Sequence, residues 1–156
     1  MWVAVGFLAG TAHRSLGIAT ANLGVSEAPP SNTVSAYISF NWDHVYNYRK
    51  ASAVAVDHYW ILTTAHVADD YQYSSDITIA GETYTQQEAI FHNSADLALV
   101  RFDKLFPGYY LLPASTASVV NKKVVMVGYG NRGGVSSSSF AEVMGTDGTK
   151  RWGPQK

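Results

Sequence analysis

Short runs of apolar residues, separated by polar and turn-forming residues, are the dominant pattern along this chain. Residues 51–56 (ASAVAV), 60–64 (WILTT) and 97–102 (LALVRF) are the clearest of these runs. Runs of four to eight residues that are rich in β-branched and aromatic side chains are typical of strands. The pattern therefore predicts three short β-strands here, with Val54, Ile61 and Val100 in their common core.

Further segments extend the same pattern. Residues 34–40 alternate between apolar and polar side chains, residues 123–127 (KVVMV) are apolar, and residues 76–80 and 83–85 flank a glycine-containing turn, as in a hairpin. Only residues 65–70 suggest a helix, and that helix is a single turn. Several short strands at this spacing favour an all-β, antiparallel barrel or sandwich.

The beginning of the chain has a different character. Residues 1–12 (MWVAVGFLAGTA) are apolar, and Ala19 and Ala21 provide a small-x-small cleavage site. We expect residues 1–21 to be a secretory signal peptide, which implies a secreted or periplasmic protein; a buried first strand or helix is the alternative. An apolar run this short cannot cross a bilayer as a helix, so no membrane span is expected.

Composition and charge exclude several classes of protein. Hydrophobic residues make up 47% of the chain and charged residues 15%, which excludes a disordered chain. The net charge of -1 provides no basic field for nucleic acid, so no nucleic-acid partner is expected. Because the chain has no cysteine, thiolate chemistry, disulfides and cysteine-ligated zinc are excluded as well.

Two residues carry the candidate chemistry, His66 and Asp96. An apolar run delivers His66, and the small residue Ala65 before it lets the chain turn sharply. Asp96 stands directly before the apolar run 97–102. A carboxylate at the mouth of an apolar strand is held rigidly and partly desolvated, so it can fix an imidazole tautomer and stabilise the imidazolium. The two residues therefore suggest a general base and the carboxylate that orients it.

The residues around this pair resemble the trypsin and chymotrypsin family of serine proteases, in a cysteine-free, bacterial-type form. Residues 60–66 (WILTTAH) resemble the family's histidine motif, W-V-L-T-A-A-H, and residues 96–100 (DLALV) resemble its aspartate motif, D-I-A-L-L. Three weaker matches stand in the family's order, at residues 25–30 (VSEAPP), 111–113 (LLP) and 125–130 (VMVGYG). Five ordered matches form a specific signal.

The resemblance implies a fold of two six-stranded antiparallel β-barrels with the active site between them. Residues 22–113 would form the first barrel, and residues 114–156 would be a linker and the truncated start of the second. By the same resemblance, His66 would take the serine proton and Asp96 would orient His66. The implied protein is a monomeric serine endopeptidase that acts on polypeptides without a cofactor or a metal.

One departure from the family pattern is large. The nucleophile motif Gly-Asp-Ser-Gly-Gly does not occur in these 156 residues. We therefore expect a nucleophile-free N-terminal fragment that is almost inert by itself. In such a fragment, residues 123–127 would lack strand partners, and the glycine- and serine-rich residues 131–139 would form a loop or linker.

Three functions other than a protease are alternatives for this sequence. The histidines and acids at positions 57, 58, 66, 92 and 96 could hold a metal, although H-E-x-x-H and H-x-H spacings are absent. A catalytically inactive, protease-like binding module would also retain this scaffold. A carbohydrate-binding surface could use exposed aromatic residues, for which the candidates are Trp42, Tyr46, Tyr48, Tyr71 and Tyr73.

Overall fold

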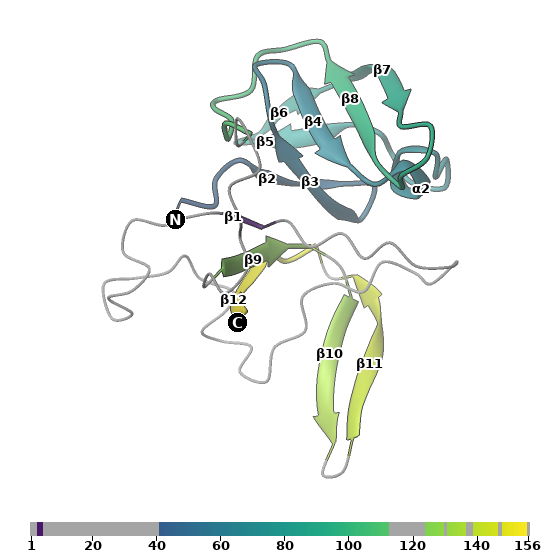
Figure 1. The fold of residues 1–156 in the computed structure, drawn as a ribbon, viewed down its shortest axis with the longest axis vertical. Helices are drawn as coiled ribbons and strands as arrows, with labels where there is room; N and C mark the ends of the chain where they lie inside the picture. The colour runs from purple at the N-terminus through teal and green to yellow at the C-terminus, as the bar shows by residue number, and fades with distance from the viewer. Residues whose placement is uncertain are drawn as a thin grey trace.

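The computed structural model describes residues 3–4, 41–112, 124–129, 131–136, 139–146 and 148–155. Within them, the largest sheet has five strands in the order β2-β3-β4-β8-β7, and all of its neighbours are antiparallel. The sheet curls into the upper body of the molecule in Figure 1. Its strands are β2 (Val45–Tyr48), β3 (Ala51–Ala55), β4 (Trp60–Thr63), β7 (Gln86–Phe91) and β8 (Ala98–Phe102).

A separate hairpin accompanies this sheet. Strands β5 (Ile77–Ile79) and β6 (Glu82–Tyr84) pair as the sequence predicts, across a turn in which Ala80 and Gly81 have left-handed φ angles of 51° and 85°. The fold is therefore all-β and mainly antiparallel. A closed six-stranded barrel is not confirmed, because the strand pairs of the described residues do not close the sheet. The strand predicted over residues 34–40 lies outside the described residues.

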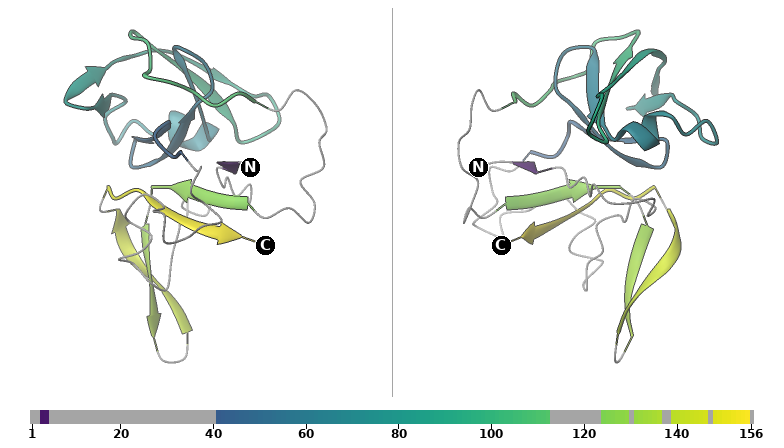
Figure 2. Two further views of the ribbon diagram at one scale, coloured as in Figure 1. Left: turned by 90° about the vertical axis from the view of Figure 1, so that its left-hand side faces the viewer. Right: turned by 45° about the vertical axis from the view of Figure 1, so that its right-hand side comes forward.

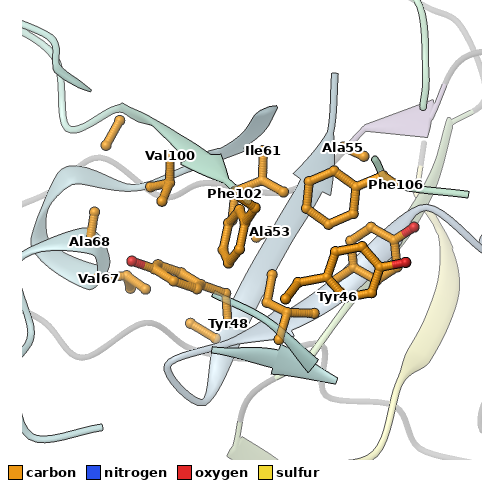
Figure 3. Packing of buried hydrophobic residues seen from close by; sticks show 14 residues of the cluster. Tyr46, Tyr48, Ala53, Ala55, Ile61, Val67, Ala68, Val100, Phe102 and Phe106 are labelled. Carbon is orange, nitrogen blue, oxygen red and sulfur yellow. The ribbon is translucent and has the colours of Figure 1, made fainter. Parts of the chain in front are cut away.

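Alternation along the strands creates two buried faces. Ile61 and Val100 are paired across β4 and β8, and both are fully buried in the cluster of Figure 3, together with Phe102. Because successive side chains of a strand point to opposite faces, Val54 lies on the other face, where it is 6% exposed. All three predicted core residues are buried, but they belong to two different clusters.

The outer face of the five-stranded sheet is covered by a second sheet. Strand β9 (Val124–Gly128) lies between β1 (Val3–Ala4), which is parallel to it, and β12 (Arg151–Gln155), which is antiparallel. Figures 1 and 2 show these three strands directly below the larger sheet. Val125 and Val127 of β9 are 1% exposed and pack in one cluster with Trp42, Val45, Val54 and Trp152.

Two expectations about the end of the chain are therefore wrong. Strand β9 has partners on both sides, because β12 and β1 complete its hydrogen bonding. Residues 131–139 also contain strand structure, since β10 (Asn131–Ser136) pairs with β11 (Ser139–Thr146). Strand formation depends strongly on context, and here the antiparallel partner outweighs the weak strand preference of glycine and serine.

Polar contacts also join the two sheets. The Ser52 hydroxyl of β3 accepts a hydrogen bond from the Tyr129 N–H (2.8 Å) and donates one to the Tyr129 carbonyl (3.1 Å). Lys150 donates to the Trp42 carbonyl (3.0 Å) and lies over the rings of Trp42 and Tyr129. Apolar packing and these bonds together hold the second sheet against the first.

The aromatic residues proposed as a carbohydrate surface are mostly internal. Trp42, Tyr46 and Tyr48 are 8%, 6% and 0% exposed, so they do not form a carbohydrate-binding surface. The spacing of two residues between Tyr46 and Tyr48 instead places both on one face of strand β2, and both point into the core. Only Tyr71 (81%) and Tyr73 (44%) are exposed. Among the described residues, no helix is long and apolar enough to cross a membrane.

Acidification should destabilise the region around His44. Burial lowers the pKa of His44 below the ordinary 6.5; the charge of Lys150 acts in the same direction, and Asp43 opposes them. The His44 Nδ1 is buried without a hydrogen-bond partner. Since the unfolded chain then binds the proton more readily, this contribution to stability is complete above about pH 6.5 and falls as the pH drops below it.

Thermal unfolding of the wild type and of the His44→Gln variant between pH 7.5 and 5 tests this. We expect the melting temperature of the wild type to fall more steeply with acidification, because the variant has no imidazole at this position. Parallel melting-temperature profiles would contradict a buried, neutral His44.

Candidate active site

Strand pairing brings His66 and Asp96 to the same end of the large sheet. Strands β4 and β8 are antiparallel neighbours, and Thr63 at the end of β4 pairs with Ala98 at the start of β8. His66 lies just after β4 and Asp96 just before β8, so the register places them side by side. Figure 1 shows the end of β4 and the start of β8 meeting beside the helical turn α2 (Ala65–Ala68).

His66 is presented by this single helical turn, which the sequence predicts. Thr64 precedes it in an extended conformation (φ -81°, ψ 150°), and the Asp69 N–H closes the turn on the Ala65 carbonyl (3.0 Å). Val67 and Ala68 are buried in the core beside Tyr48, as Figure 3 shows. The His66 side chain therefore points away from the core, and 47% of it is exposed.

A buried arginine secures the segment that follows α2. Arg49, which is 8% exposed, donates hydrogen bonds to the carbonyls of Asp70 and Tyr73 and stacks near the rings of Tyr48 and Tyr71. It holds this position from the β2–β3 turn, with a left-handed φ of 49°. This structural role of Arg49 could not be predicted from the sequence, because a single arginine in a turn belongs to no recognisable motif.

The Asp96 carboxylate holds His66 at two points. Its Oδ2 lies 2.6 Å from the His66 Nδ1, and its Oδ1 accepts the His66 backbone N–H at 2.9 Å. The predicted contact between the two side chains is present. Because an ionised carboxylate can only accept, this geometry places the proton on Nδ1 and leaves the lone pair of Nε2 available. The hydrogen bond from the His66 backbone N–H to Oδ1 also fixes the orientation of the Asp96 carboxylate relative to the His66 ring.

The surroundings keep the Asp96 carboxyl ionised. Partial burial by itself raises its pKa, but the backbone N–H of His66, the His66 ring and the Ala65 N–H outweigh this, so the pKa lies below its usual value. Hydrogen bonds to the charged form favour that form. Asp96 therefore remains an acceptor at neutral pH, as the His66 tautomer requires.

The turn that delivers Asp96 is organised by a second histidine. Residues 92–97 connect β7 to β8, and the His92 N–H closes this connection on the Leu97 carbonyl (2.9 Å). The His92 Nδ1 accepts hydrogen bonds from the N–H groups of Ser94 (3.2 Å) and Ala95 (3.0 Å). From the sequence, His92 was a candidate metal ligand only. Its role as acceptor of two backbone N–H groups depends on the conformation of the turn, which the sequence does not show.

The other histidine and acid candidates do not assemble into a site. His58 is exposed, and its ring contacts Tyr109 with the two centroids 4.8 Å apart. Among the described residues, no group of three or more histidines and acids is placed to hold a metal ion. The five positions suggested for a metal are therefore not brought together.

A comparison with known families finds one match that covers most of the chain. The family model described as the trypsin-like peptidase domain matches residues 51–155, more than half of the chain. The chain belongs to the trypsin-like peptidase family. The searches of the curated proteins and of the solved structures found no match to this chain. The matched range begins at β3 and includes His66, Asp96 and all of β9 to β12.

Proposed function

We propose that this domain belongs to a serine endopeptidase in which His66 is the general base and Asp96 is the residue that orients it. The observation that carries the proposal is the contact of 2.6 Å between Asp96 Oδ2 and His66 Nδ1, which in the neutral ring leaves the lone pair on Nε2, on a half-exposed side chain. Membership in the trypsin-like peptidase family supports the same reaction class, the hydrolysis of peptide bonds.

In the proposed reaction, His66 Nε2 removes the proton of a serine hydroxyl as the serine oxygen attacks the scissile carbonyl. Asp96 stabilises the imidazolium that forms. His66 then gives the proton to the leaving amine, and a second cycle with water in place of the serine releases the acid. None of the serines of this chain stands in a Gly-Asp-Ser-Gly-Gly motif, so we propose that the nucleophile belongs to polypeptide outside these 156 residues.

Several finer features belong to the same proposal. The five-stranded sheet and the β5–β6 hairpin would form a first six-stranded barrel, in which β6 and β7, separated only by Thr85, act as one strand. Strands β9 to β12 would contribute to a second barrel. Residues 1–21 would direct secretion to the periplasm or the medium; β1 lies within them, so their removal would leave β9 paired with β12. The complete enzyme would act as a monomer on polypeptides. The chain by itself, without the nucleophile, would be almost inert as a peptidase.

Reaction with a fluorophosphonate tests the proposed function. We expect a protein expressed from the reading frame extended beyond Lys156 to be labelled on one serine, and the chain of 156 residues not to be labelled. Labelling depends on an activated nucleophile, so it should be lost on acid unfolding and in a His66→Ala variant of the extended protein. Mass spectrometry of the labelled peptide identifies the serine.

The absence of the nucleophile motif from this sequence favours a second candidate, a catalytically inactive binding module. In that case the extended frame would contain no in-frame Gly-Asp-Ser-Gly sequence, and no serine would react with the fluorophosphonate. These two results together would contradict the proposed endopeptidase and support the inactive binding module.

A further inference from the structure

The turn between β7 and β8 depends on the His92 side chain for two of its backbone hydrogen bonds. The backbone closes the turn at its base, where Phe91 pairs with Ala98 and the His92 N–H reaches the Leu97 carbonyl. Inside the turn, the N–H groups of Ser94 and Ala95 both point to the His92 Nδ1, at 3.2 and 3.0 Å. Asp96 follows directly.

The chemistry of this contact specifies the state of the ring. Two N–H donors require an acceptor, so Nδ1 of His92 must carry its lone pair and the ring must be neutral, with its proton on Nε2. His66 has the opposite tautomer, because its Nδ1 faces the Asp96 carboxylate at 2.6 Å. The site therefore holds two histidines in opposite tautomers: His66 is hydrogen-bonded to Asp96, and His92 to the two amides that precede Asp96.

We propose that His92 is a positioning residue, whose neutral imidazole folds the turn that presents the Asp96 carboxylate to His66. The proposal rests on the function proposed above for Asp96, but its structural content does not require peptidase activity. Loss of the Nδ1 acceptor removes both hydrogen bonds. The position of the Asp96 carboxylate then depends on its contacts with His66 and with the Ala65 N–H.

His92 is exposed, and no ion pair of His92 occurs in the described part of the chain. The titratable groups linked to it through the turn are Asp96 and, beyond it, His66. The Leu97 N–H bonds the Ala95 carbonyl (2.8 Å), so backbone contacts continue from the capped residues directly into β8. A change in the hydrogen bonding of the His92 ring therefore alters the backbone of Ala95, which is covalently bonded to Asp96.

Three variants of His92 separate this role from a general effect on stability. In His92→Asn, the amide oxygen can occupy the position of Nδ1 and accept both N–H groups. His92→Gln and His92→Ala place no acceptor at that position. His58→Asn serves as the matched control, because His58 is an exposed histidine outside this turn.

The experiment uses the 156-residue chain, with long-range ¹H–¹⁵N spectra to read the tautomers of His66 and His92 and amide exchange to follow Ser94 and Ala95. We expect the Nε2–H tautomer at His92 and the Nδ1–H tautomer at His66 in the wild type. Loss of the two hydrogen bonds in His92→Ala and His92→Gln should speed exchange of both amides by roughly threefold to tenfold. The population of the Nδ1–H tautomer at His66 should fall in the same variants.

The asparagine variant provides the second readout. The protection of the Ser94 and Ala95 amides, corrected for intrinsic exchange, should stay at the wild-type level in His92→Asn. His92→Asn should also retain the wild-type tautomer at His66. The proposal is overturned if the alanine and glutamine variants leave the His66 tautomer unchanged, or if the asparagine variant loses it equally. An inactive extended enzyme with these spectra intact would instead count against the proposed function alone.

Discussion

Replacing His66 with alanine in the extended protein should reduce peptide-bond turnover by roughly four to six powers of ten. The reason is that the base, the nucleophile and the orienting carboxylate act as one unit, and loss of the base alone removes most of their joint effect. The Asp96 carboxylate, 2.6 Å from the His66 ring, then has no imidazole to orient. Initial rates on a fluorogenic peptide measure the effect, under conditions in which kcat and KM are separated.

His58→Ala is the matched control for this prediction. His58 is also exposed and precedes the same strand, β4, but it faces no carboxylate and contacts the ring of Tyr109. Its replacement should leave kcat within about twofold, as is usual for surface positions away from special features. Comparable losses in the two variants would show that fold stability, and not the base, limits turnover. A loss of less than tenfold in His66→Ala would remove His66 from the mechanism.

The part of the site that the sequence could predict depends on strands with a strong local pattern. The apolar runs at residues 60–64 and 97–102 became β4 and β8, and the hydrophobic pattern fixed which of their residues face the core. Antiparallel pairing of these strands is enough to place His66 near Asp96. The single helical turn at Ala65–Ala68 was also recognised, because the apolar run ends there.

The parts that could not be predicted depend on contacts between distant segments. Strand β12 contains Gly153 and Pro154, which weaken any strand pattern, and it forms because β9 provides its partner. The reciprocal hydrogen bonds between Ser52 and Tyr129 join residues 77 positions apart. His92 appeared as a possible metal ligand, since nothing in its sequence neighbours shows that two amides turn back to its ring.

Truncation of Phe102 should have the largest effect on stability in the described core. Phe102 is 0% exposed, and its ring meets those of Tyr48 and Phe106 with centroids 6.2 and 5.4 Å apart. Figure 3 shows it in the centre of the packed cluster. Phe102→Ala should lower the free energy of unfolding by about 3–5 kcal/mol, because the lost burial is joined by a cavity that rigid neighbouring strands cannot fill. Urea unfolding followed by circular dichroism measures the change.

Phe91→Ala provides the comparison for this effect. Phe91 lies on β7, the strand next to β8, and 43% of its side chain is exposed. The same truncation there should cost about 1 kcal/mol or less, since water already contacts much of the ring. Because Asp96 lies two residues before β8, Phe102→Ala should weaken the His66–Asp96 contact at urea concentrations where Phe91→Ala retains it. Equal unfolding midpoints for the two variants would mean that the Phe102 ring is not enclosed by Tyr48 and Phe106 in solution.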